Sequence, residues 1–268
     1  MICGGLKPGE RKRRQAERVR LLSEALDVEI LAHFYQRLDV KALARHVGGS
    51  RGLLARVAAS RARAVMMCGV SFLVEAAERL RPDLSVLTPR ADAGCPFSEM
   101  VGPAEALEAR RARPGALLVA DVKAARAVKE LCDVALDPPE SLTALSWPAE
   151  RPATVLPALS SGDPDALPHR DWPGAECQVH RQVGPEAVRT ILRQRPGALT
   201  AVNALCLPEV RALADHVGDS QSMWDWCLSC EADDVLVVGE SGLVESLRAA
   251  RPEKRFWETD VEVFCPNM

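Results

Sequence analysis

The sequence lacks the features that would direct a chain to a membrane, out of the cell or onto a nucleic acid. Its basic stretch at residues 7–20 is not followed by the apolar run of a signal peptide. No apolar run approaches the roughly 20 residues needed to span a bilayer. Lysine and arginine (34) do not outnumber aspartate and glutamate (37), so no basic excess favours a nucleic-acid partner. We therefore expect a cytoplasmic protein with no membrane and no nucleic acid as partner.

A second CxxC motif is also missing, so the pair Cys227 and Cys230 does not indicate a zinc ribbon. The pair lies on a predicted helix. It is either two reduced cysteines without function or a pair with a redox or metal-binding role. Cysteine itself is plentiful. There are nine, an odd number, and no secretory signal accompanies them, which favours free, metal-bound or redox thiols over a disulfide framework.

Three of the nine cysteines lie in turn-like settings far apart in the sequence. Cys95 and Cys265 each precede a proline, and Cys177 follows the pair Pro173-Gly174. We interpret this pattern as three segments that meet at one centre and hold an iron–sulfur cluster. Three thiolates would leave one iron open to a substrate hydroxyl or carboxylate, whereas a fourth would favour electron transfer. Isolated cysteines are also often inert core residues, and spacing alone leaves that alternative open.

Short apolar segments alternate with longer helix-forming ones, which is typical of an α/β fold with parallel sheets. The expected strands are residues 28–32, 64–68, 84–87, 116–120, 134–136 and 154–159. The expected helices are residues 9–26, 40–47, 53–61, 72–81 and 123–131. His33 and Tyr35 follow the first strand and can face the same side. Because ligands bind beyond the carboxyl ends of such strands, both are candidate site residues, with a structural pair as the alternative.

An internal repeat runs through the chain at a constant offset, under which residue 40 matches residue 210. Residues 40–50 (VKALARHVGGS) and 210–220 (VRALADHVGDS) are identical at eight of eleven positions. The repeat indicates a duplicated α/β unit. Two of the pairs that it defines are candidate pocket positions, His33 with Asn203 and Ser50 with Ser220. It also pairs His46 with His216, which are expected on helices in packing or surface roles.

The middle of the chain has the same alternation, so we predict three α/β domains. They span residues 1–105, 106–185 and 186–268, and the third repeats the first. Residues 137–171 are rich in proline, serine and glycine and are expected to be mostly loop. Each domain is too small to be well stabilised alone, so we expect the three to pack around a shared centre.

Eight segments, in this order, give the chain its resemblance to a known family. They are Ala32-His33-Phe34-Tyr35-Gln36, Gly49-Ser50-Arg51-Gly52-Leu53, Gly69-Val70-Ser71-Phe72, Ala93-Gly94-Cys95, Trp172-Pro173-Gly174 with Cys177-Gln178-Val179-His180, Val217-Gly218-Asp219-Ser220, Gly239-Glu240-Ser241-Gly242-Leu243 and Cys265-Pro266-Asn267-Met268. Over residues 27–268 the chain resembles the quinolinate synthase family. The resemblance implies three similar small αβα domains with parallel sheets, in a pseudo-threefold arrangement around a central [4Fe-4S] cluster. It also implies condensation of iminoaspartate with dihydroxyacetone phosphate to quinolinate.

The resemblance carries roles over by position. It makes Cys95, Cys177 and Cys265 the cluster ligands. It makes His33, Tyr35 and His180 the catalytic candidates, and Ser50 and Ser220 binding residues for the phosphate and carboxylate groups of small-molecule substrates. We add Lys123 and Asn203 as substrate-binding candidates, because they occupy family positions that contact substrate.

Several positions depart from the family pattern, and two segments among them concern proton transfer and substrate binding. Asn203-Ala204-Leu205 stands where the family has His-Pro-Glu, and leucine cannot replace the glutamate as a general base. Asp121-Val122-Lys123 stands where the family has Tyr-Val-Asn, and Lys123 could attract a carboxylate. We therefore expect a quinolinate-synthase-like enzyme with an altered substrate or reaction.

Two alternatives stay open at this point. The chain could be an authentic quinolinate synthase of NAD biosynthesis with relocated acid–base groups, or a non-catalytic cluster-binding protein. In each case we expect a monomer or homodimer. Cys206, which follows the altered segment, is expected in the pocket wall.

Overall fold

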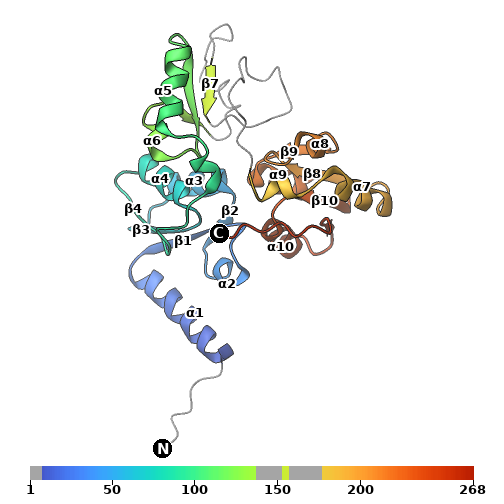
Figure 1. Ribbon diagram of the computed structural model, residues 1–268. Coiled ribbons are helices and arrows are strands. Elements are labelled where there is room, and N and C mark those ends of the chain that lie inside the picture. The colour runs from blue at the N-terminus through green and yellow to red at the C-terminus, as the bar shows by residue number, and fades with distance from the viewer. Residues whose placement is uncertain (1–7, 137–152, 157–176) are drawn as a thin grey trace, which may run out of the picture.

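The computed structural model describes residues 8–136, 153–156 and 177–268. Its strands form three separate sheets, all parallel, with helices packed on them (Figure 1). We call the parts of the chain around these sheets the first, second and third units. The predicted α/β fold of repeated small domains is confirmed. Within the described residues, no helix is both long enough and apolar enough to cross a bilayer.

The first unit begins with a long N-terminal helix and ends with a short 3-10 turn. Its elements are α1 (Pro8–Ala25), β1 (Val28–His33), α2 (Leu38–Lys41), β2 (His46–Gly48), α3 (Ser50–Ala59), β3 (Ala64–Cys68), α4 (Ser71–Leu80), β4 (Ser85–Leu87) and η1 (Pro96–Glu99). The strands are ordered β2-β1-β3-β4. The central strand β1 is almost fully buried, as expected for a parallel sheet covered on both faces.

The second and third units repeat this plan. The second contains α5 (Pro103–Ala112), β5 (Leu117–Asp121), α6 (Arg126–Lys129), β6 (Val134–Leu136) and β7 (Ala153–Leu156), in the order β6-β5-β7. The third contains η3 (His180–Gln182), α7 (Pro185–Gln194), β8 (Leu199–Asn203), α8 (Pro208–Arg211), β9 (His216–Gly218), α9 (Ser220–Ser229), β10 (Asp234–Val238), α10 (Ser241–Ala250) and β11 (Arg255–Trp257), in the order β9-β8-β10-β11. The domain boundaries given above remain a prediction.

The offset found in the sequence holds for the elements themselves. From α2 to β4, every element of the first unit has a counterpart of the same type and length in the third unit, shifted by that offset. The second unit follows the first at a constant offset of its own, so α6 matches α2 and β6 matches β2. Even the helix-to-strand turn is shared, since Asp27 (φ 51°) and Gly197 (φ 93°) are equivalent and both left-handed.

The predicted helix over residues 40–47 is wrong. α2 ends at Lys41, and the chain enters β2 at His46. The reason lies in tertiary structure. The backbone N–H of Arg45 donates to the carbonyl oxygen of Ile30 at 2.8 Å, which brings this segment beside β1 although its local pattern favours helix.

The other two units make the same contact. Asp133 and Asp215 donate backbone N–H groups to β5 and β8 at 2.8 and 2.9 Å. The helix predicted for residues 123–131 is therefore reduced to α6. His46 and His216 begin strands, so their predicted place on helices is also wrong. The expected loop over residues 137–171 lies, apart from β7, outside the described residues.

The first and third units approach each other closely at two glycines. A Cβ on Gly49 would lie 2.7 Å from the backbone nitrogen of Gln221, and one on Gly242 would lie 2.6 Å from the carbonyl oxygen of Phe34. The amide of Gln221 adds a polar contact, because its Oε1 accepts the N–H of Gly49 at 3.0 Å. This docking places the carboxyl ends of β1 and β8 on the same cavity.

Candidate functional site

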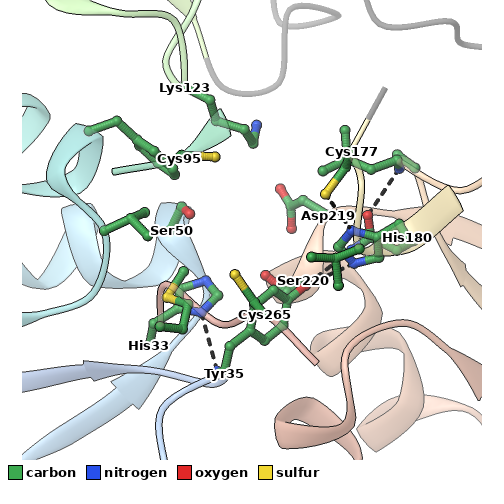
Figure 2. Close-up of a pocket in the computed structure, with 17 residues that line it drawn as sticks. His33, Tyr35, Ser50, Cys95, Lys123, Cys177, His180, Asp219, Ser220 and Cys265 are labelled. Atoms are coloured by element: carbon green, nitrogen blue, oxygen red, sulfur yellow. Dashed lines mark hydrogen bonds between the residues drawn. The ribbon is translucent and has the colours of Figure 1, made fainter. Parts of the chain in front are cut away.

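All the candidate site residues line one cavity between the three units (Figure 2). They are His33, Tyr35, Ser50, Cys95, Lys123, Cys177, His180, Asn203, Ser220 and Cys265. The cavity has a volume of about 120 Å³, several times that needed by one water molecule. The predicted site residues thus lie together, while their individual roles stay predictions.

The cysteines that the sequence analysis singled out reach the cavity from three segments. Cys95 precedes η1, Cys177 precedes η3, and Cys265 lies in the C-terminal tail. The tail is tied to the first of these segments, because Asn267 Nδ2 donates to the carbonyl oxygen of Gly94 at 2.8 Å.

Two of the cysteine segments are supported in the same way. Cys95 and Cys265 are equivalent under the repeat offset. The residue two positions before each cysteine is Ala93 or Val263, and its carbonyl oxygen accepts the N–H of the first residue of a helix in the same unit. Ser71, at the start of α4, donates at 2.8 Å, and Ser241, at the start of α10, donates at 2.9 Å.

The thiols affect one another as well as the cavity. Burial, together with the neighbouring Cys95 and Cys177, raises the pKa of Cys265 to about 11. Burial is also the main cause of the raised pKa of Cys177. Within the described residues, no three histidine, cysteine or acidic side chains lie close enough to hold a single metal ion. Three thiols around a cavity instead fit a multi-iron cluster, whose separate irons take ligands from different sides.

His33 is held as a neutral imidazole in one tautomer. The backbone N–H of Tyr35 donates to Nδ1 at 3.2 Å, so the ring proton resides on Nε2. Burial lowers the pKa of His33 to about 3, assisted by the positive charges of Lys123 and Lys41. The side chain can therefore donate a hydrogen bond at neutral pH without carrying charge.

Tyr35, His180 and Asn203 form a contact group beside His33. The Tyr35 hydroxyl lies 3.5 Å from His180 Nε2 and 3.4 Å from Asn203 Nδ2, which donates to it. Burial, followed by the charge of Glu240, raises the pKa of Tyr35 well above its usual value. Burial lowers the pKa of His180 to about 4. A neutral phenol thus faces a neutral imidazole, whose Nδ1 lies 3.3 Å from Cys177 Sγ.

Two serines place helix N-termini at the cavity. Ser50 is the first residue of α3, and Ser220 is the first residue of α9. Asp219 caps α9 by accepting the N–H of Ser222 at 2.7 Å, whereas Gly49 provides no side-chain cap for α3. A helix start without such a cap leaves backbone N–H groups that favour an anion.

Lys123 supplies positive charge to the same space. Its Nζ lies 3.2 Å from Asp121 Oδ1, and its side chain is 16% exposed. After burial, its positive charge is the next cause of the lowered pKa of both His33 and His180. An anionic group entering the cavity would meet this charge and the α3 N-terminus.

Comparisons with known proteins give the same answer over nearly the whole chain. A family model described as "Quinolinate synthetase A protein" matches residues 17–268. The quinolinate synthase of Geotalea uraniireducens is 33% identical over 244 residues, covering 89% of this chain and 80% of that protein. The chain belongs to the quinolinate synthase family.

Further members of the quinolinate synthase family match over a similar length. The quinolinate synthase of Geobacter metallireducens is 31% identical, covering 94% of this chain and 84% of its own. "Quinolinate synthase 2" of Methanosarcina acetivorans is 30% identical, covering 94% and 83%. The resemblance inferred from eight short segments is confirmed.

The two segments expected to differ from the family pattern both reach the cavity. Leu205 lines it beside Asn203, and Lys123 lines it beside the second sheet. The leucine offers only an apolar surface.

Two acidic residues near the cavity were not predicted as site residues. Asp219 lines it as the cap of α9, and a helix start at Ser220 is a signal that could have identified it. Glu240 is 1% exposed and accepts the N–H of Gly242 at 2.7 Å and that of Cys265 at 3.5 Å. Burial raises the pKa of Glu240 to about 7. No pattern in the sequence indicates that this glutamate is buried.

The remaining cysteines of the described residues are not among those that line the cavity. Cys206 is not among its lining residues and packs in the core of the third unit with Val202 and Val238, so its predicted place in the pocket wall is wrong. Cys227 and Cys230 lie at the end of α9, close to the predicted helical position. Burial raises the pKa of Cys227 to about 12, which keeps that thiol protonated.

Proposed function

We propose that the chain holds a [4Fe-4S] cluster through Cys95, Cys177 and Cys265 and acts on small carboxylated or phosphorylated substrates by condensation or dehydration. The convergence of three thiols with two neutral histidines and a neutral tyrosine on one cavity carries this proposal. When bound, such a cluster supplies a Lewis-acid site at the iron that lacks a thiolate.

The protein groups around the cavity suit proton transfer and anion binding. The Tyr35 hydroxyl and His180 Nε2 lie 3.5 Å apart, so a proton donor and a proton acceptor can both reach one substrate. His33 donates from Nε2 to a substrate oxygen. Lys123 and the N-terminus of α3 at Ser50 provide charge and N–H groups for a phosphate or carboxylate.

We further propose that the substrate or the reaction differs from that of quinolinate synthesis. The support is the cavity wall, where Leu205 occupies the position of the general base expected for the family and Asn203 that of a histidine. Neither side chain can accept a proton at neutral pH. Authentic quinolinate synthesis in NAD biosynthesis is the second candidate. It is favoured by the Tyr35–His180 contact, which could take over the proton transfer.

The first experiment is iron and sulfide analysis of the full chain purified without oxygen. We expect about four irons per chain. Cys95→Ala, Cys177→Ala or Cys265→Ala should each lose most of them, while Cys230→Ala serves as the matched control and keeps them. Absence of iron after reconstitution would rule out the cluster.

A second experiment separates the candidate reactions. Iminoaspartate and dihydroxyacetone phosphate are supplied to the cluster-loaded chain, and quinolinate is measured. Formation at an ordinary enzyme rate supports authentic quinolinate synthesis and contradicts the altered reaction. No product, combined with a change in the electron paramagnetic resonance spectrum on adding small carboxylates, supports the altered reaction. An unchanged spectrum favours a non-catalytic cluster-binding protein.

A further inference from the structure

Three buried cationic side chains occupy equivalent positions in the three units. Lys41 is the last residue of α2, Lys129 the last of α6 and Arg211 the last of α8. They are 8%, 4% and 8% exposed. Burying a cation is costly unless its hydrogen bonds are satisfied, so the recurrence of this feature in every unit requires a structural reason.

Each cation binds a carbonyl oxygen of its own unit at an equivalent position. Lys41 Nζ donates to Phe34 O at 3.1 Å, and Lys129 Nζ donates to Val122 O at 3.1 Å. In the third unit, Arg211 donates to the carbonyl oxygen of Ala204 at 3.3 Å. Each of these acceptor residues follows the central strand of its unit and lies between the last residue of that strand and a residue that lines the cavity.

The other side of the same peptide group makes an equivalent contact in each unit. The N–H that shares a peptide plane with Phe34 O belongs to Tyr35, and it donates to His33 Nδ1 at 3.2 Å. The N–H of Lys123 donates to Asp121 Oδ1 at 2.7 Å. In the third unit, the N–H of Leu205 donates to Asn203 Oδ1 at 3.0 Å.

Because the peptide is planar and trans, its C=O and N–H point in opposite directions. A cation that fixes the C=O therefore fixes the N–H. In the first unit that N–H selects the tautomer of His33. In the second unit it places Asp121 against the backbone of Lys123, the residue whose charge faces the cavity.

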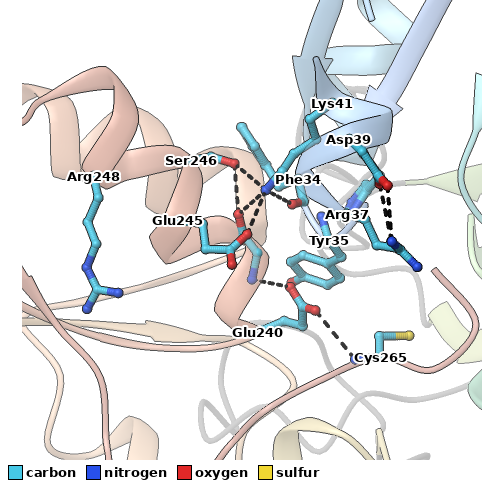
Figure 3. Close-up of polar contacts among 12 residues, drawn as sticks. Phe34, Tyr35, Arg37, Asp39, Lys41, Glu240, Glu245, Ser246, Arg248 and Cys265 are labelled. Carbon is cyan, nitrogen blue, oxygen red and sulfur yellow. Dashed lines mark hydrogen bonds and ion pairs between the residues drawn. The ribbon is translucent and has the colours of Figure 1, made fainter. Parts of the chain in front are cut away.

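Two of the cations also reach an adjoining unit. Figure 3 shows the contacts of Lys41. Lys41 Nζ donates to Gly242 O at 2.9 Å and Ser246 Oγ at 3.0 Å, and it lies 3.4 Å from Glu245 Oε2. Lys129 Nζ lies 3.2 Å from Glu75 Oε2. Glu245 on α10 and Glu75 on α4 are themselves equivalent in the repeat.

We infer that Lys41 and Lys129 are positioning residues that lock the cavity-lining strand ends of one unit to a helix of another. Lys41 orients the peptide that holds His33 and Tyr35, and Lys129 orients the peptide that holds Asp121 and Lys123. The contacts of the two lysines do not depend on the proposed function. Its consequence for catalysis rests on the proposed function, in which His33, Tyr35 and Lys123 act on substrate.

The test compares Lys41→Met with Lys129→Met, each the control for the other. Amide hydrogen exchange is followed by mass spectrometry in the full chain purified without oxygen. Lys41→Met should speed exchange at residues 34–36 and 242–246 by about tenfold and leave residues 122–124 unchanged. Lys129→Met should give the reverse pattern.

Milder variants cover the case in which a methionine variant does not fold. Ser246→Ala removes one partner of Lys41 and Glu245→Gln removes the negative charge of another, and each should speed exchange at residues 34–36 but not at 122–124. Lys41→Arg should retain slow exchange, because arginine fills this position in the third unit. The inference would be overturned if the Lys41 and Lys129 variants gave the same exchange pattern. It would also be overturned if neither variant changed exchange at residues 34–36 or 122–124.

These measurements are independent of turnover. If the iron analysis or the quinolinate assay fails, the reciprocal exchange pattern still decides whether the two lysines position the strand ends. If the pattern fails while the cluster and an activity are found, only this inference is lost.

Discussion

At the scale of single residues, burial rather than sequence neighbours determines the state of the site. His33 and His180 both have a pKa far below the usual value, and the principal cause for each is removal from water. Sequence could predict that these residue types gather at strand ends. It could not predict their protonation, because that depends on side chains from all three units, Lys123 among them.

The low pKa of His33 predicts an acid-dependent loss of stability. The unfolded chain protonates this histidine near pH 6.5, while the folded chain protonates it only near pH 3. Between these values the unfolded state binds more protons, so the free energy of unfolding falls as the pH falls. From pH 7.5 to pH 5 the histidine accounts for about 2 kcal/mol of that loss.

His33→Asn should remove this part of the pH dependence. Asparagine is chosen because Asn203 accepts the equivalent backbone N–H in the third unit. Urea midpoints at pH 7.5 and pH 5 are compared at equal iron content. The prediction fails if the variant loses as much stability as the parent chain over this interval.

The departures expected at Asn203 and Leu205 give a second prediction at this scale. Installing the residues expected for the family, Asn203→His with Leu205→Glu, returns a general base to the cavity wall. If the altered-reaction proposal holds, quinolinate formation by the cluster-loaded double variant should rise by at least about 100-fold. The control is Leu205→Gln, which matches glutamate in size but cannot accept the proton. An equal rise in that variant would contradict the explanation.

At the scale of elements, the sequence predicts strands more reliably than short helices. β3 and β6 have the predicted bounds, because a buried apolar run of that length has few other uses. The helices expected over residues 40–47 and 123–131 are cut short, because the next segment hydrogen-bonds to the central strand. A local pattern carries no information about that contact.

The relation between elements was visible in part. The constant offset that predicted a repeated unit also pairs Cys95 with Cys265, each followed by proline. Aligning the repeat fully would have identified these two as equivalent. Cys177 has no such equivalence, so its place at the cavity was indicated by its turn-like setting and by the resemblance.

Gly242 gives a prediction about how two elements dock. A Cβ at this position would lie 2.6 Å from Phe34 O and 3.0 Å from the Cα of Tyr35, both backbone atoms that cannot move separately. Gly242→Ala should therefore destabilise the folded chain by about 1–3 kcal/mol. Thermal unfolding measures the effect. Gly115→Ala is the control, since nothing lies within 4 Å of its Cβ, and an equal loss in both variants would contradict this account.

At the scale of the whole molecule, three small sheets share one centre. Each sheet is formed within its own stretch of sequence, so long-range order depends on contacts between units. If the cluster is present, its three thiolates come from the segments that follow the three sheets, and it joins them covalently.

This arrangement predicts that cluster removal loosens the whole fold. Oxygen exposure followed by chelation should lower the thermal midpoint, by about 2–4 °C for each kcal/mol of binding lost. The same treatment should have little effect on Cys95→Ala, which starts without a full cluster. An unchanged midpoint in the parent chain would show that the three units are held by protein contacts alone.

The chain contains a single tyrosine, and it is Tyr35. Its ring therefore provides a single magnetic label at the cavity, with no mutation and no attached dye. Fluorotyrosine incorporated during expression would give one fluorine resonance, assigned without further work. Ligand entry, iron loading and movement between the first and third units would each be observed at the same atom.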